Sequence, residues 1–150
     1  MMPEIVIRNA LLRDIPHFLP LMEQLGYPQS LEGLQKRFEV FATQPDYGVL
    51  LAEATTQVLG WIAWSKSPLF ISDITRIHIE GLVVDRNFRG QGIGKKLMAE
   101  VEKFAAQFSP CIIDLTSGLK RAKDGTHEFY KSLGYQNEGA MAKLYLRKVL

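Results

Sequence analysis

The spacing of apolar positions predicts a strand and two helices in the N-terminal part of the chain. A β-branched run at Ile5–Arg8 is typical of a short strand. Asp14 is expected to cap a helix whose apolar positions recur at helical spacing up to Gly26. Because an interior proline removes a backbone donor, Pro20 predicts a kink or an early break in that helix. A second amphipathic helix is expected over Leu31–Ala42.

Strand-forming residues replace this helical pattern in the middle of the chain. Turn signals divide the region into three segments, which suit consecutive antiparallel strands at Tyr47–Ala54, Val58–Ser65 and Thr75–Val84. Strict alternation in the last of them would put Ile77, Ile79 and Gly81 on one face, and His78, Glu80, Leu82 and Val84 on the other. Two ionisable side chains, those of His78 and Glu80, therefore share a face.

The remaining elements are expected to be a helix, a strand, a short helix and a last strand. Their predicted bounds are Gly92–Phe108, Cys111–Thr116, His127–Leu133 and Ala142–Val149. The complete order predicts an α/β or α+β domain built on one mixed sheet. Because Trp61 and Trp64 fall on opposite faces of their strand, we expect at most one of them in the core.

Composition limits the size and the class of the protein. With 150 residues, 47% of them apolar, the chain is expected to form a single domain over residues 1–150. A formal charge of +2 is too weak for a dedicated nucleic-acid or membrane-surface binder. One cysteine and three scattered histidines exclude a disulfide scaffold and a zinc finger, so no metal is expected. Without a signal pattern or a long apolar run, we expect a soluble, cytoplasmic protein.

The densest chemical signal is a glycine-rich loop, Arg89–Lys96, between a predicted strand and an amphipathic helix. Such a loop exposes backbone N–H groups at the positive end of the helix dipole, which predicts a phosphate site; close packing alone is the alternative. The P-loop motif fails, because Arg89 stands where its first glycine belongs and Lys96 where its hydroxyl residue belongs. The dinucleotide-binding fingerprint fits Gly90 and Gly92, but Lys95 stands where its third glycine belongs. A dinucleotide-binding oxidoreductase therefore remains an alternative function.

Two motifs resemble a known family. Arg89-x-x-Gly92-x-Gly94 matches the R/Q-x-x-G-x-G/A signature of the GNAT superfamily of N-acetyltransferases, and His127–Tyr135 resembles its H-x-F-Y-x-x-x-G-[FY] segment. Two separated motifs in the correct order are stronger evidence than either alone. The resemblance implies a GNAT-like fold: a mixed, mostly antiparallel sheet with splayed central strands, flanked by about four helices.

The resemblance also implies acetyl-coenzyme A (acetyl-CoA) as the co-substrate, bound between the strand that ends at Val84 and the strand at Cys111–Thr116. In the family, the first of these strands pairs with the pantetheine arm and the glycine loop holds the pyrophosphate. The cofactor-binding positions implied here are Leu82, Val83, Val84, Arg89, Gly90, Gln91, Gly92, Ile93, Gly94 and Lys95.

Acetyl transfer needs an acid and a base, and the resemblance indicates residues for both. Tyr130 would protonate the departing thiolate, because a phenol stays protonated at neutral pH; without the motif it would be interpreted as a core aromatic. Glu80 or His78 would accept the proton of the attacking amine, with a cross-strand ion pair as the structural alternative for each. Many family members have an asparagine seven residues before the tyrosine, where this chain has Lys123.

Together these observations predict an N-acetyltransferase that transfers the acetyl group of acetyl-CoA directly to a small-molecule amine in a ternary complex. The expected partner is that amine, with no nucleic acid and no membrane, and a homodimer is left open. A non-catalytic acyl-CoA-binding or interaction module is the alternative from another class. The identity of the acceptor and the length of the acyl group are left open by the sequence.

Overall fold

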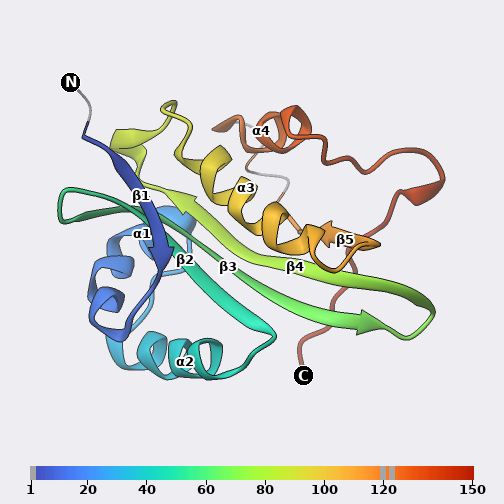
Figure 1. Ribbon diagram of the computed structural model, residues 1–150, viewed down its shortest axis with the longest axis horizontal. Helices are drawn as coiled ribbons and strands as arrows, with labels where there is room; N and C mark the ends of the chain where they lie inside the picture. The colour runs from blue at the N-terminus through green and yellow to red at the C-terminus, as the bar shows by residue number, and fades with distance from the viewer. Residues whose placement is uncertain (1–2, 119–120, 122–123) are drawn as a thin grey trace. The chain divides into compact units, whose positions relative to one another are not determined.

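The computed structural model describes residues 3–118, 121 and 124–150, and the chain divides into two compact units, Met1–Ile113 and Asp114–Leu150 (Figure 1). The elements of the first unit are β1 (Ile5–Asn9), the 3-10 helix η1 (Leu12–Phe18), α1 (Leu19–Leu25), α2 (Leu31–Thr43), β2 (Tyr47–Ala54), β3 (Gln57–Leu69), β4 (Ser72–Val84), η2 (Arg86–Phe88), α3 (Ile93–Ala106) and β5 (Cys111–Asp114), whose last residue opens the second unit. The second unit also contains α4 (Thr126–Ser132) and the 3-10 helix η4 (Gly139–Met141).

The strands of the described part of the chain form one five-stranded sheet in the order β1-β2-β3-β4-β5. The pairs β1·β2, β2·β3 and β3·β4 are antiparallel. In Figure 1, α1 and α2 lie on one side of these strands, here named the α1 face, and α3 lies on the other, the α3 face. With four α-helices among the described residues, the architecture confirms the predicted α/β class and its mostly antiparallel sheet.

A register shift in β4 corrects the prediction of strict alternation. Ala63 of β3 pairs with Gly81, whereas the next residue, Trp64, pairs with Ile79, so Glu80 is an extra residue in the ladder. Because residues directly opposite each other share a face, Ile79 lies with Trp64 while Gly81 lies with Ala63. The β-bulge therefore reverses the faces of β4 at Glu80.

The bulge separates residues that simple alternation had grouped. His78 pairs with Ser65, and both lie on the α1 face. Leu82 pairs with Ile62 two residues before Trp64, which puts Leu82 and Val84 on the α3 face. The expectation that Leu82 and Val84 share the face of His78 is wrong, because a sequence pattern does not reveal a bulge.

Both tryptophans of β3 are buried, so the expectation of at most one in the core is wrong. Trp61 stacks on Phe18 with ring centroids 5.7 Å apart, and Trp64 packs against Phe104 of α3 at 4.6 Å. Helices cover both faces of the sheet, and each face thus buries one indole. A Cβ on Gly81 would lie 2.9 Å from the Trp61 ring, so the missing side chain gives that ring its space.

The N-terminal helix differs in detail from its prediction. Asp14 does not cap an α-helix; it lies inside η1, and its carboxylate accepts a hydrogen bond of 2.7 Å from the backbone N–H of Leu11. Pro20 is the second residue of α1, so the predicted break is confirmed and falls just before it, where a proline is tolerated. Gly26 ends α1 in the left-handed region, with φ of 100°.

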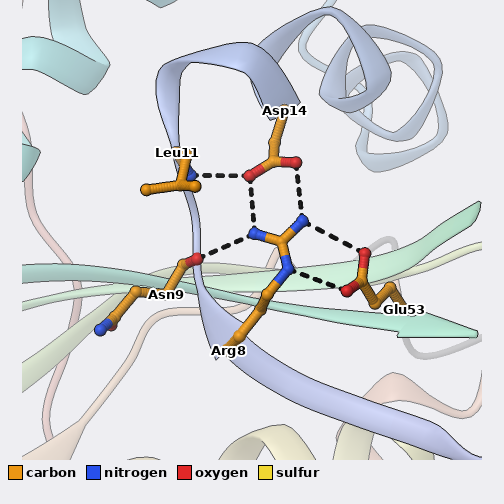
Figure 2. A network of polar contacts seen from close by, with 5 residues as sticks. All are labelled: Arg8, Asn9, Leu11, Asp14 and Glu53. Carbon is orange, nitrogen blue, oxygen red and sulfur yellow. Dashed lines mark hydrogen bonds and ion pairs between the residues drawn. The ribbon is translucent and has the colours of Figure 1, made fainter. Parts of the chain in front are cut away.

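Arg8 connects β1, η1 and β2 through a network of charges (Figure 2). Its guanidinium donates two hydrogen bonds to Asp14, at 2.8 and 2.9 Å, and two to Glu53, at 2.9 and 3.1 Å. The Asp14 side chain is almost fully buried. Hydrogen bonds from Arg8 hold the pKa of Asp14 below its usual range, against the opposing effect of burial. The guanidinium therefore forms a bidentate pair with each of the two carboxylates.

The predicted last strand is absent from the structure. The segment 142–149 has no regular secondary structure, and the side chains of Leu144, Leu146 and Val149 are exposed. The Asn137 side chain bonds both backbone groups of Lys143, accepting from its N–H at 2.7 Å and donating to its C=O at 3.2 Å. Side-chain hydrogen bonds of this kind compete with the backbone hydrogen bonds of a strand ladder. Apolar periodicity alone does not provide such a ladder.

Candidate active site

The connection from β4 to α3 is fixed to the rest of the first unit by backbone hydrogen bonds. The N–H of Asp85 donates to the carbonyl of Leu59 at 2.7 Å, and the N–H of Arg86 donates to the side chain of Gln24 at 2.8 Å. The N–H of Phe88 then closes a turn onto the Asp85 carbonyl at 2.9 Å. The glycine loop that follows is therefore held from both β3 and α1.

The glycine loop has a backbone that favours glycine at two positions. Gly90 and Gly92 each have φ of 80°, in the left-handed region, and Gly92 is the N-cap of α3. A Cβ added to either residue would meet no atom within 4 Å. The space in front of the loop is thus open, and glycine is required there by the backbone conformation rather than by close packing.

The N-terminus of α3 has the electrostatics of an anion site. Its first turn contains no acidic residue, and Gly92 offers no capping side chain. The helical ladder begins with Lys96 donating to the Gly92 carbonyl at 3.0 Å, so the preceding N–H groups of Ile93, Gly94 and Lys95 point out of the helix. The exposed side chains of Lys95 and Lys96 add positive charge, and these features fit a pyrophosphate group.

The predicted cofactor-binding residues differ in what they expose. Arg89 and Gln91 are exposed, and the Arg89 side chain donates to the Val84 carbonyl at 3.1 Å, which ties the loop to the end of β4. The side chains of Val83 and Ile93 are buried in the core. At these two positions a ligand could contact the backbone only. Leu82, Val83 and Val84 pair with β3, and β5 is the neighbour of β4 on its other side.

Glu80 and His78, the two candidate bases, have different partners on the α1 face. The Glu80 carboxylate is exposed and accepts a hydrogen bond of 2.8 Å from the hydroxyl of Ser65. His78 Nδ1 lies 3.1 Å from a guanidinium nitrogen of Arg76. Because a guanidinium can only donate, Nδ1 is the acceptor in that contact and the proton of a neutral ring is on Nε2. His78 thus has no lone pair to accept a proton while the contact lasts.

The candidate acid, Tyr130, belongs to the second unit. Its ring is partly buried and meets those of Phe129 and Tyr135 edge to face, at 5.1 and 6.1 Å between centroids. Burial raises the pKa of Tyr130 to about 12, with Arg121 opposing the shift. The phenol is therefore protonated at neutral pH, as a proton donor must be. In the same unit His127 Nε2 lies 3.0 Å from the Gly118 carbonyl, and Lys123 is outside the described residues.

The glycine loop, Glu80 and His78 belong to the first unit, and Tyr130 and its aromatic neighbours belong to the second. Sequence reasoning missed Ser65, which contacts Glu80, and Gln24, which holds the start of the loop. Both act on residues far away in the chain. Only the register of β3 against β4 could have indicated Ser65.

Among the residues that the structure describes, no group of three His, Cys, Asp or Glu side chains could hold a metal ion. Within the same residues, none of the helices combines the length and the apolar character needed to cross a bilayer.

Comparisons with known proteins relate the chain to acetyltransferases. It is 28% identical over 157 residues to an uncharacterized N-acetyltransferase of Methanocaldococcus jannaschii, across 95% of this chain and 65% of that protein. It is 30% identical over 129 residues to the tRNA uridine(34) acetyltransferase of Dehalococcoides mccartyi, across 78% of this chain and 26% of that enzyme. The chain thus spans less than two thirds of the length of either relative.

A solved structure supports the fold. A GNAT family acetyltransferase of Staphylococcus aureus superposes with a TM-score of 0.77 over 99% of this chain and 100% of that one, at 22% identity. The sequence match to the family extends over residues 14–135, which include both the glycine loop and Tyr130. The chain therefore belongs to the acetyltransferase (GNAT) family.

Proposed function

We propose that this protein is an N-acetyltransferase that transfers the acetyl group of acetyl-CoA directly to a small-molecule amine within a ternary complex, with the two compact units acting as one catalytic domain. The observation that carries the proposal is the open glycine loop at the N-terminus of α3, in a chain of this family. Members of the family generally use acetyl-CoA. That co-substrate supplies an activated thioester, and every other step depends on residues of this chain.

The loop residues bind and orient. Backbone N–H groups from Gly90 to Lys95 hold the pyrophosphate, and the cationic side chains of Lys95 and Lys96 add attraction. The end of β4, at Leu82–Val84, offers backbone groups to the pantetheine amides. Binding through backbone groups explains how Val83 and Ile93 can serve in the site although their side chains lie in the core.

Glu80 is the proposed base and Tyr130 the proposed acid. Glu80 accepts a proton from the ammonium form of the substrate, and the amine nitrogen attacks the thioester carbon. The attack forms the carbon–nitrogen bond, and the carbon–sulfur bond then breaks with its electron pair remaining on sulfur. Tyr130 donates its phenolic proton to that sulfur and regains one from solvent. Glu80 releases its first proton to solvent, accepts the second nitrogen proton and releases that one as well. The products are an amide, a thiol and one released proton.

Glu80 is preferred to His78 because of their hydrogen bonds. A carboxylate has about four lone-pair sites, so the bond from Ser65 to one oxygen leaves acceptor capacity for the amine. His78 accepts at Nδ1 from Arg76 and would have to break that contact before taking a proton. A small amine is proposed rather than nucleic acid because the formal charge is only +2. A cytoplasmic location and a homodimer stay predictions.

The test is an initial-rate assay with acetyl-CoA and a panel of amines, following thiol release and identifying acetylated products by mass spectrometry. Direct transfer predicts intersecting double-reciprocal lines when both substrates are varied. Parallel lines together with an acetylated protein in the absence of amine would contradict direct transfer. Binding of acetyl-CoA without turnover of any amine would support the acyl-CoA-binding module, and binding of a nicotinamide dinucleotide in its place would support the oxidoreductase.

A further inference from the structure

Ser65 is joined to the proposed base across the sheet. Its hydroxyl donates a hydrogen bond of 2.8 Å to Glu80 Oε1, from the middle of β3 to β4. The directly opposite partner of Ser65 is His78, so the contact with Glu80 is diagonal. It is made in the α1-face region where β4 carries its extra residue.

The bulge explains why Glu80 needs such a partner. As the extra residue of β4, Glu80 has no residue directly opposite it on β3 to restrict its side chain. A long, exposed glutamate would then sample several rotamers, and ordering it costs free energy at each turnover. A hydroxyl donor selects one orientation of the carboxylate.

We propose that Ser65 is a positioning residue that acts through Glu80: its hydroxyl orients the carboxylate and keeps it ready to accept a proton. The inference rests on the proposed function, because it takes Glu80 as the base. It extends the site to β3, which none of the motifs covers. It also gives the bulge a role, since without the shift of register the side chain of residue 80 would have a different neighbour on β3.

The chain offers matched variants for the test. Ser65→Ala removes the hydroxyl, Ser65→Thr restores it, and Ser67→Ala makes the same change two residues further along the same face of β3, at a residue paired with Arg76. We expect Ser65→Ala to lower kcat/KM about tenfold, as for a lost hydrogen bond to a charged group. Ser65→Thr and Ser67→Ala should behave like the parent, and KM for acetyl-CoA should not change.

A double variant tests whether the effect passes through Glu80. In a Glu80→Gln background, Ser65→Ala should cause no further loss of kcat/KM. A parent-like kcat/KM for Ser65→Ala would overturn the proposal, and so would an equal additional loss in the Glu80→Gln background, which would mark Ser65 as merely structural.

A measurement without substrate separates this inference from the proposed function. NMR scalar couplings report whether the Glu80 side chain occupies one χ1 rotamer or averages over several. The parent and Ser65→Thr should show one rotamer, and Ser65→Ala should show averaging. Equal averaging in the parent and Ser65→Ala would overturn the positioning role. If the parent turned over no amine, the proposed function would fail, while this comparison would still decide the role of Ser65.

Discussion

Replacing Arg8 with methionine should destabilise the protein by an amount that depends on pH. The substitution keeps a side chain of similar length but removes the guanidinium, which donates four hydrogen bonds to Asp14 and Glu53. Asp14 would then be a buried carboxylate with the Leu11 N–H as its remaining donor in the network of Figure 2. A charge left in this position is costly, because desolvation is no longer offset by a partner.

The size of the effect follows from how exposed each partner is. Breaking a fully buried ion pair costs about 3–5 kcal/mol. The Asp14 side chain is 7% exposed, but those of Arg8 and Glu53 are 26% and 24% exposed, so water screens part of the interaction. We therefore expect a loss of about 2–3 kcal/mol at pH 7. For a chain of this size that corresponds to a fall in Tm of about 4–12 °C. Glu53→Gln, at the more exposed carboxylate, should cost about 1 kcal/mol or less.

The dependence on pH has a definite sign. Arg8 lowers the pKa of Asp14 in the folded state, so the stability that this pair contributes is complete above the ordinary aspartate pKa of about 3.9 and is lost as the pH falls below it. Urea unfolding of the parent and of Arg8→Met at pH 7 and at pH 3 measures the difference directly. It should shrink at pH 3. A difference that is the same at both pH values, or below about 1 kcal/mol at pH 7, would refute the electrostatic account and indicate lost packing alone.

Three further predictions concern the proposed site and the core beside it. Gly92→Asp should abolish binding of acetyl-CoA in calorimetry while the fold persists. Gly92→Asn introduces a neutral side chain of the same shape that tolerates positive φ, so this variant should retain much more affinity. Equal affinities of the two variants would show that no anion binds there. Tyr130→Phe should lower kcat by about 100-fold or more with little change in the affinity for acetyl-CoA, and near-full kcat in the variant would remove the role of acid. Because burial raises the pKa of Tyr130 to about 12, ionisation of the phenol should not reduce the parent's kcat at any pH below about 11. Gly81→Ala should lower the free energy of unfolding by about 1–3 kcal/mol in urea titrations, because its Cβ would lie 2.9 Å from the buried Trp61 ring; an unchanged midpoint would mean that the ring can move aside.

Features with a local cause could be predicted from the sequence. Ser30 caps α2 by accepting from the N–H of Gly33 at 3.1 Å, and the bounds of that helix follow from this contact and the apolar spacing. The break at Pro20 and the left-handed turns at Gly26 and Gly92 also depend on a few neighbouring residues only. In each case the deciding interaction lies within one turn of the chain.

Features decided by a distant partner could not be predicted. The bulge at Glu80 exists because β3 and β4 pair with a shift, and no residue of β4 alone reveals it. The burial of both tryptophans required knowing that helices cover both faces of the sheet. The apolar run over 142–149 had the composition of a strand, but a strand also needs a neighbouring backbone, and the Asn137 side chain bonds the backbone of Lys143 instead.

The proposed site also contains both kinds of feature: one part is determined by the local glycine motif, and another part depends on distant residues of the chain. The motif is local, and a backbone with two left-handed glycines before α3 is enough to form the candidate anion site. The carboxylate proposed to face the amine depends instead on the register of β3 against β4 and on Ser65. Acceptor preference can therefore change through these non-local contacts while the motif stays the same. The α1 face around Glu80 is therefore the place to search for the residues that select the acceptor of the proposed reaction.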